Sequence, residues 1–143
     1  MDNKNKITVV VCAFNSEKFI AKTLYCIVNQ NYKFFDLLII NDGSNDKTES
    51  VIFDFFKKHN YFYDYVSFKQ NKGIAEVRKY ALENVKNKYV IFVDSDDMPH
   101  INLVDKLYTK ITSDNDLIAV GCYHKFINEF GEKITGGLFI GEK

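Results

Sequence analysis

The sequence has few of the residues that mark special architectures. Its 143 residues include no tryptophan, one proline, seven glycines and three cysteines. The cysteines are Cys12, Cys26 and Cys122. An odd, scattered set fits neither a disulfide framework nor a zinc site of ordinary spacing. We therefore interpret them as free thiols in a reducing compartment.

Long apolar runs and an excess of one charge are also missing. No segment reaches the roughly 20 apolar residues of a membrane-spanning helix. Residues 7–14 are apolar, but too short for a signal peptide and without a small-residue cleavage site, so a core strand is the better interpretation. The 19 basic and 19 acidic residues balance, which disfavours nucleic acid as a partner. We expect a cytoplasmic protein, with any membrane association peripheral and at the inner face.

What the sequence does contain is an alternation of apolar runs and amphipathic stretches. We predict strands at residues 7–14, 37–40, 65–68, 89–93 and 117–122. Apolar residues at helical spacing predict helices around residues 19–28, 51–56, 74–85 and 101–111, and the glycine-containing tail is expected to form a hairpin or loops. Such alternation predicts an α/β fold with a mostly parallel sheet and helices on both faces.

Short polar motifs predict where three of these helices begin. Ser16 is a suitable N-terminal cap for the first helix. Asp46 and Glu49 have the spacing of a capping box at the second helix. Pro99 is suited to the first turn of the last helix, where its missing N–H costs nothing.

The acidic residues that follow the apolar run 89–93 are the main functional signal. Asp94 and Asp96 are two positions apart, so on an extended backbone their side chains point the same way. Such a pair of repelling carboxylates is costly unless a cation or a ligand rich in hydrogen-bond donors lies between them. Oxygen ligands favour Mg²⁺ or Mn²⁺, which bind phosphate oxygens directly. The pattern therefore predicts a metal site for phosphate-containing ligands; Asp97, one position further, is equally suited to capping the next helix.

Several other phosphate-binding classes are disfavoured. The turn after the first strand has no glycine, so it cannot form the G-x-G-x-x-G loop of dinucleotide enzymes. No G-x-x-x-x-G-K-S/T loop is present, which disfavours a P-loop phosphotransferase. A response-regulator-like domain needs paired acids after its first strand, whereas this strand ends in Phe14 and Asn15.

Four segments in order carry a resemblance to a known family. They are residues 9–15 (VVVCAFN), 39–44 (IINDGS), 71–73 (NKG) with Arg78, and 92–97 (FVDSDD). Together they make the chain resemble the N-terminal, nucleotide-binding half of family 2 glycosyltransferases, which have the GT-A fold. This Rossmann-like fold has a mostly parallel sheet covered on both faces. The resemblance extends over roughly residues 6–100.

The resemblance implies an enzyme that transfers a sugar from a nucleoside-diphosphate donor, most commonly a UDP-sugar, to a hydroxyl group. It implies inversion at the anomeric carbon, a glycan or lipid-linked acceptor, and a role in polysaccharide or cell-surface glycan synthesis. By resemblance, Asp94 and Asp96 bind Mn²⁺ or Mg²⁺. The implied nucleotide-sugar-binding residues are Phe14, Asn15, Asp42, Lys72, Arg78, Asp94 and Ser95. Phe14 would stack on the base and Asp42 would face it.

The sequence also departs from the family pattern. Cys12 or Ala13 stands where the family often has proline, and Val77 replaces a common alanine. The family's catalytic base lies well downstream of the paired acids, so the base stays unassigned here. We therefore expect residues 1–143 to be a single donor-binding domain, a fragment lacking the acceptor half. The alternative function is a nucleotide-sugar-binding module without turnover.

Overall fold

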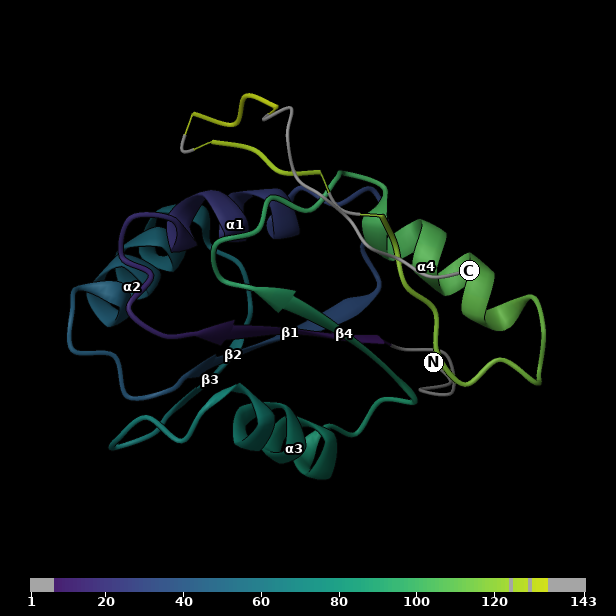
Figure 1. Ribbon diagram of the computed structural model, residues 1–143, viewed down its shortest axis with the longest axis horizontal. Coiled ribbons are helices and arrows are strands. Elements are labelled where there is room, and N and C mark those ends of the chain that lie inside the picture. Colours follow the sequence, from purple (N-terminus) through teal and green to yellow (C-terminus); the bar gives the residue numbers. More distant parts are fainter. Residues whose placement is uncertain (1–6, 124, 129, 134–143) are drawn as a thin grey trace. The chain divides into compact units, whose positions relative to one another are not determined.

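The computed structural model describes residues 7–123, 125–128 and 130–133, and it has a parallel β-sheet at its centre (Figure 1). The strands are β1 (Ile7–Ala13), β2 (Phe35–Asn41), β3 (Asp64–Ser67) and β4 (Tyr89–Asp94). They form one 4-stranded sheet in the order β3-β2-β1-β4, with all pairs parallel. The predicted α/β class and parallel sheet are confirmed.

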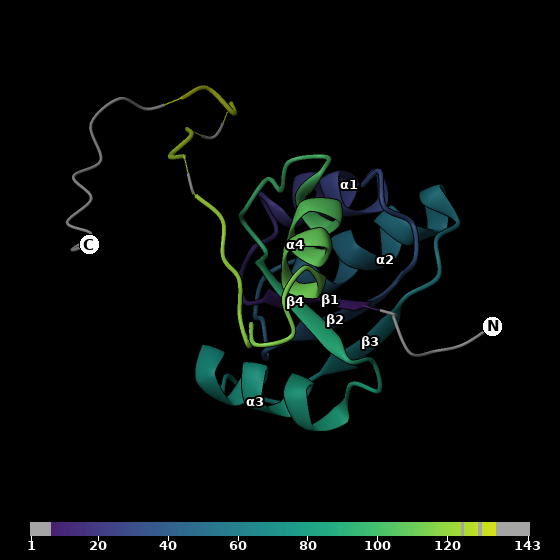
Figure 2. The same ribbon diagram turned by 90° about the vertical axis from the view of Figure 1, so that its right-hand side faces the viewer.

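Helices cover both faces of this sheet, as predicted. The covering helices are α1 (Ile20–Val28), α2 (Thr48–His59) and α3 (Ile74–Asn84); a fourth helix, α4 (Leu103–Thr112), follows them in the chain. Figure 2 shows α1 and α2 on one side of the strands and α3 on the other. The chain divides into two compact units, Met1–Lys106 and Leu107–Lys143. The first unit holds the whole sheet, and the strand ends discussed below all belong to it.

The core explains why the two central strands, β1 and β2, are apolar on both faces. Side chains alternate along a strand, so Val10 and Cys12 of β1 point to one face together with Leu38 and Ile40 of β2. These four pack with residues of α3 in one buried cluster. The intervening residues of the two strands are also buried and face the side covered by α1 and α2: Val9, Val11, Leu37 and Ile39.

The register places the carboxyl ends of the strands level with one another. Ala13 pairs with Asn41, Asn41 pairs with Ser67, and Cys12 pairs with Asp94. From β1 the chain proceeds to β2 on one side, whereas β4 lies on the other side. Ligands of open parallel sheets bind where the strand order reverses in this way. The fold therefore favours the ends of β1 and β4 as the site.

The predicted Ser16 cap is wrong at the first helix, and the predicted capping box is wrong at the second. α1 begins at Ile20, and the Ser16 side chain does not cap it; the Ser16 carbonyl accepts N–H bonds from Phe19 and Ile20. In the second helix, the Asp46 carboxylate accepts from the Thr48 N–H (2.9 Å) and hydroxyl. The capping box does not form, because the Glu49 carboxylate that would close it accepts a hydrogen bond from the Tyr65 hydroxyl at 2.9 Å. A tertiary contact therefore replaces the local one.

Two predictions near the C-terminus are also wrong. Pro99 is not in the first turn of α4, which begins four residues later at Leu103. Residues 117–122 do not form a strand. A strand needs a partner for its backbone groups, and within the described part of the second unit the only pairing is an isolated antiparallel bridge between Ile127 and Lys133. The predicted tail hairpin falls partly outside the described residues.

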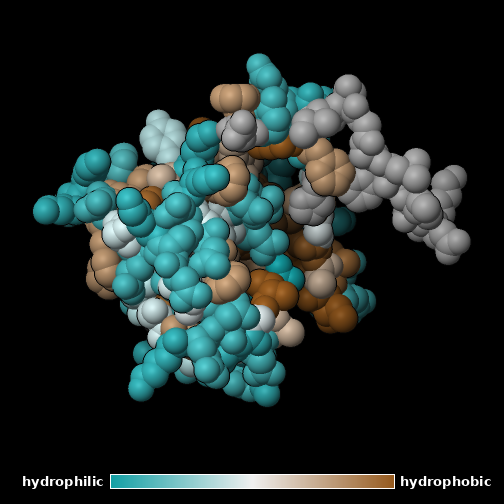
Figure 3. Space-filling view, turned by 60° about the vertical axis from the view of Figure 1, so that its left-hand side comes forward, coloured by the Kyte–Doolittle hydropathy of each residue, from teal (hydrophilic) through white to brown (hydrophobic). Residues whose placement is uncertain are grey.

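The surface of the described residues is mixed in character. The face in Figure 3 is mainly hydrophilic, with hydrophobic residues exposed among the polar ones. Phe14, directly after β1, is one such exposed side chain, at 45%. None of the helices in the described ranges combines the length and the apolar character that crossing a lipid bilayer requires.

Candidate functional site

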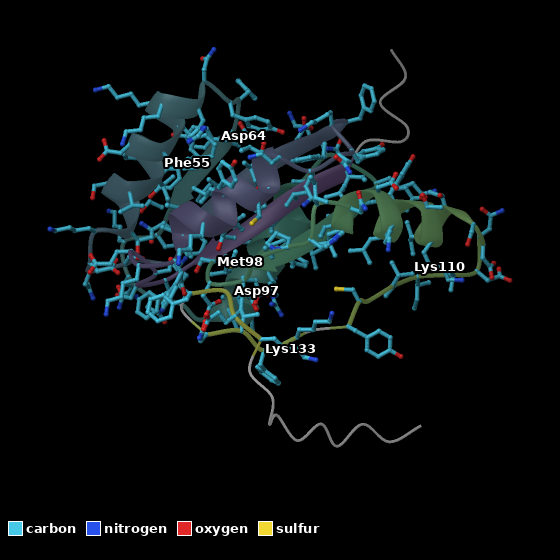
Figure 4. The ribbon with its side chains drawn as sticks, turned by 90° about the horizontal axis from the view of Figure 1, so that it is seen from above. Phe55, Asp64, Asp97, Met98, Lys110 and Lys133 are labelled. Carbon is cyan, nitrogen blue, oxygen red and sulfur yellow. The ribbon has the colours of Figure 1, made fainter. Side chains whose placement is uncertain are left out.

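The candidate site lies at the carboxyl ends of the strands. Figure 4 labels Asp64, at the start of β3, and Asp97, beyond the end of β4, at separate places, with Asp64 higher in the view. The polar residues predicted from the sequence follow the strand ends at the same edge as Asp97. Asn15 follows β1, Asp42 follows β2, and Asp96 follows β4.

The paired acids lie on a turn that begins where β4 ends. Asp94 is the last residue of β4, and its carbonyl accepts the Asp97 N–H at 3.1 Å, which closes the turn. The side chain of Asp94 is 49% exposed and Asp96 is exposed, whereas Ser95 between them is buried. The turn therefore presents both carboxylates to solvent while its middle residue anchors it in the protein.

The anchor comes from α1 and was not identified from the sequence. The Thr23 hydroxyl donates a 2.8 Å hydrogen bond to the Ser95 carbonyl, and both residues are buried. Thr23 lies in the apolar stripe of α1, beside Leu24 and close to Ile20. A polar residue on a buried helix face normally has a hydrogen-bond partner. That signal was available in the sequence, although it does not identify the partner.

We predict that Thr23→Val destabilises the protein by about 1–3 kcal/mol, because it leaves the buried Ser95 carbonyl without its donor. Thr23→Ser keeps the hydroxyl and should retain most of that stability. Urea denaturation of both variants measures the difference. Thr109→Val, at an exposed position of α4, is the control for the same substitution and should be close to neutral. Equal stability of Thr23→Val and Thr109→Val would show that the bond contributes nothing.

Arg78 of α3 lies against the first of the paired acids. Its Nη2 is 3.0 Å from Oδ1 of Asp94, and the two side chains are 43% and 49% exposed. The guanidinium also lies over the ring of Phe92, with 5.5 Å between its Cζ and the ring centroid. Its Nε is buried and has no hydrogen-bond partner among the described residues. Arg78 is therefore at the site, held by one charged contact.

Cys12 of β1 lies next to this pair, a contact that the sequence did not indicate. It is buried and pairs with Asp94 across the sheet. Burial raises the pKa of the Cys12 thiol to about 11, against the opposing effect of the nearby Arg78 guanidinium. The thiol therefore stays protonated near neutral pH, and a nucleophilic role is disfavoured. Of the other cysteines, Cys26 is partly buried and Cys122 is exposed.

Asp42 holds a loop in place. Its side chain is buried, and its two carboxylate oxygens accept N–H bonds from Lys72 (2.8 Å) and Gly73 (2.9 Å). Asp42 contacts only the backbone of Lys72. The Lys72 ammonium instead lies over the ring of Phe68, 4.5 Å from the ring centroid. The structure thus brings Asp42 and Lys72 together, but through the loop that precedes α3.

The loops after β1 and β2 are linked by hydrogen bonds in both directions. Asn15 has a left-handed backbone, with φ of 46°. Its N–H donates to the Ser44 hydroxyl at 3.0 Å, and its side-chain oxygen accepts the Asn45 N–H at 2.8 Å. One step further, the Ser16 N–H donates to the Thr48 hydroxyl at 2.8 Å. Asn15 therefore fixes the backbone just after the exposed ring of Phe14.

The donor chemistry of the site suits a hard divalent cation. Within the described residues no three Asp, Glu, His or Cys side chains form a metal-binding group. Mg²⁺ sites commonly use one or two carboxylates and take their remaining ligands from phosphates and water. Asp94 and Asp96, exposed on one turn, match that arrangement, so the residues present fit such an ion when a phosphate-containing ligand supplies the rest.

Comparisons with known proteins agree with this geometry. The sequence model of the family described as "Glycosyl transferase family 2" matches residues 8–139. The glycosyltransferase GlyA of Streptococcus pneumoniae is 37% identical over 123 residues, which cover 85% of this chain and 17% of GlyA. The range matched by the family model includes every residue of the candidate site described above.

Solved structures are similar as well. Residues 1–349 of TarS from Staphylococcus aureus, solved with UDP-GlcNAc, superpose with a TM-score of 0.67 at 25% identity, covering 76% of this chain and 31% of that one. Glucosyl-3-phosphoglycerate synthase from Mycobacterium tuberculosis, solved with Mn²⁺ and UDP, gives a TM-score of 0.62 at 25% identity, covering 75% and 39%. The chain therefore spans well under half the length of these relatives.

Proposed function

The chain belongs to glycosyl transferase family 2, and on that premise we propose that it binds a UDP-sugar for transfer to a hydroxyl group in a metal-dependent, inverting reaction. The observation that carries the proposal is the pair Asp94 and Asp96 at the end of β4, beside β1, where the strand order of the sheet reverses. Carboxylates at that edge, with Arg78 against one of them, suit a nucleoside diphosphate and its cation.

Each predicted residue has a role in the proposed complex. Asp94 and Asp96 would hold Mn²⁺ or Mg²⁺, which when bound stabilises negative charge on the diphosphate leaving group. Arg78 adds a guanidinium whose planar donors suit phosphate oxygens. Ser95 presents the two acids by fixing the turn between them. That the relatives solved with UDP-GlcNAc, or with UDP and Mn²⁺, share the fold supports this choice of donor and metal.

The base-binding side would be formed by the loops after β1 and β2. The exposed ring of Phe14 is available for stacking on uracil, and Asn15 sets its position through the bonds to the neighbouring loop. Each carboxylate oxygen of Asp42 can accept a second hydrogen bond in addition to its loop contact, so it can still accept an N–H from the base. Lys72 would contribute to nucleotide binding through the loop before α3, which Asp42 holds in place by hydrogen bonds.

The remaining parts of the proposal rest on the family and on the sequence. We propose a glycan or lipid-linked acceptor, in polysaccharide or cell-surface glycan synthesis, and a cytoplasmic location consistent with the free thiols. The base that deprotonates the acceptor hydroxyl is assigned to none of the described residues. The donor side is therefore the part of the reaction that this chain can be tested for directly.

Isothermal titration with UDP in Mn²⁺, and again in EDTA, tests the proposal. We expect UDP to bind with Mn²⁺ and to lose most of its affinity in EDTA, because the diphosphate then lacks its cation. UMP is the matched control: it carries the same base and ribose without the second phosphate, and its affinity should depend less on Mn²⁺. No binding of UDP under either condition would refute the proposal. Measuring hydrolysis of UDP-GlcNAc by the chain separates turnover from binding alone.

A further inference from the structure

We propose that Arg78 acts as an exchangeable counter-ion, occupying Asp94 in the free protein and leaving it for the diphosphate when a divalent cation binds. The inference rests on the proposed donor site and adds a coupling between its two ligands. It starts from the 3.0 Å contact between Arg78 Nη2 and Asp94 Oδ1. Asp94, the proposed metal ligand, and Arg78, the proposed phosphate-binding residue, are thus bound to each other in the free protein.

The geometry of the contact favours exchange over a permanent structural bond. Only Nη2 contacts the carboxylate, Nε is buried with no partner among the described residues, and the Phe92 ring supports the guanidinium from one side. Both charged side chains are about half exposed. An exposed ion pair of this kind is weak and can open at little cost. A permanent bond would instead be expected to be bidentate and buried.

Two opposite effects on ligand binding follow from the exchange. A divalent cation that binds Asp94 must either displace the Arg78 guanidinium or be repelled by its positive charge at short range. Arg78 therefore lowers the affinity of the protein for the metal in the absence of a diphosphate. A diphosphate that draws the guanidinium away frees Asp94, so it raises metal affinity. By linkage, the metal raises the affinity for the diphosphate by the same factor. Arg78 would thus favour loading of the two ligands together over loading of the metal by itself.

The test measures binding of Mn²⁺ alone, followed by the electron paramagnetic resonance signal of free Mn²⁺, in the absence of nucleotide. Arg78→Met should bind Mn²⁺ about tenfold more tightly than the unmodified chain, within the usual range of such couplings. Lys79→Met is the matched control, because it removes one positive charge from an exposed position of the same helix. Its Mn²⁺ affinity should stay unchanged. Arg78→Gln is a second variant should Arg78→Met fold poorly by circular dichroism.

The outcomes separate this inference from the proposed function. Unchanged or weaker Mn²⁺ binding in both Arg78 variants would overturn the exchange, as would the absence of Mn²⁺ binding in all forms. If the unmodified chain binds UDP with Mn²⁺ but the variants show no gain, only the exchange is refuted. If the variants gain Mn²⁺ affinity while UDP binds to none, the competition between Arg78 and the cation for Asp94 stands, whereas the transfer of Arg78 to the diphosphate is refuted together with the UDP proposal. If Lys79→Met gained as much Mn²⁺ affinity as Arg78→Met, the effect would be due to net charge alone and the exchange would be refuted.

Discussion

Asp96→Asn is expected to weaken Mn²⁺-dependent UDP binding by at least about 100-fold, since removal of a residue that only supports a metal ligand already costs 10–100-fold. Asp96 is exposed on the turn after β4, so the substitution should not disturb the core. The amide is nearly the same size as the carboxylate, but it carries no charge and one oxygen fewer to offer a cation. The loss should therefore appear in binding while the unfolding transition stays unchanged.

The measurement is titration of UDP at saturating Mn²⁺, with thermal unfolding recorded on the same samples. Asp97→Asn is the matched control, because it removes the same charge one position further along the turn. It should change the UDP affinity by less than about threefold, as expected for a neighbouring charge at an exposed site. Equal losses in the two variants would mean that overall negative charge, and not ligation by Asp96, governs binding. No loss in Asp96→Asn would remove that residue from the metal site.

The architecture could be predicted because its signals are local. Strands buried on both faces, such as β1 and β2, appear as continuous apolar runs. Four of the five predicted strands are present. The failure at residues 117–122 shows the limit of that rule, because an apolar run becomes a strand only when another strand accepts its backbone groups. Nothing local to those residues says whether such a partner exists.

The position of the candidate site in the fold was predictable, but its contacts were not. The order of the strands and their register bring the ends of β1, β2 and β4 level, as expected for a parallel sheet. By contrast, Thr23 contacts Ser95 across 72 positions of sequence, and Asp42 contacts Lys72 across 30. The capping box of the second helix failed for the same reason, since Glu49 is bonded to Tyr65 and not to its own helix start.

Gly43→Ala is expected to lower the free energy of unfolding by about 2–5 kcal/mol, from left-handed backbone strain of about 1–2 kcal/mol and overpacking of about 1–3 kcal/mol. Gly43 follows Asp42 and has φ of 68°. A Cβ atom there would lie 2.5 Å from the backbone carbonyl carbon of Gln70, a distance that side chains do not tolerate. Because the obstacle is backbone, it cannot rotate away as a flexible side chain would.

The loop that Gln70 belongs to must therefore move, and it is the loop that Asp42 holds through Lys72 and Gly73. Hydrogen exchange at these two amides should accelerate in Gly43→Ala, while the melting temperature falls by roughly 5–15 °C.

Two glycine controls isolate the cause of that effect. At Gly121 an added Cβ meets nothing within 4 Å and φ is not positive, so Gly121→Ala should be neutral. Gly73→Ala has φ of 86° and also meets nothing within 4 Å, so it carries backbone strain without an overlap. If Gly43→Ala melts like Gly121→Ala, the close approach of the two loops does not exist in solution. If Gly43→Ala is destabilised but exchange at Lys72 and Gly73 is not faster, the strain is absorbed elsewhere. The hydrogen bonds from Asp42 would then be strong enough to keep the loop in place despite the overlap.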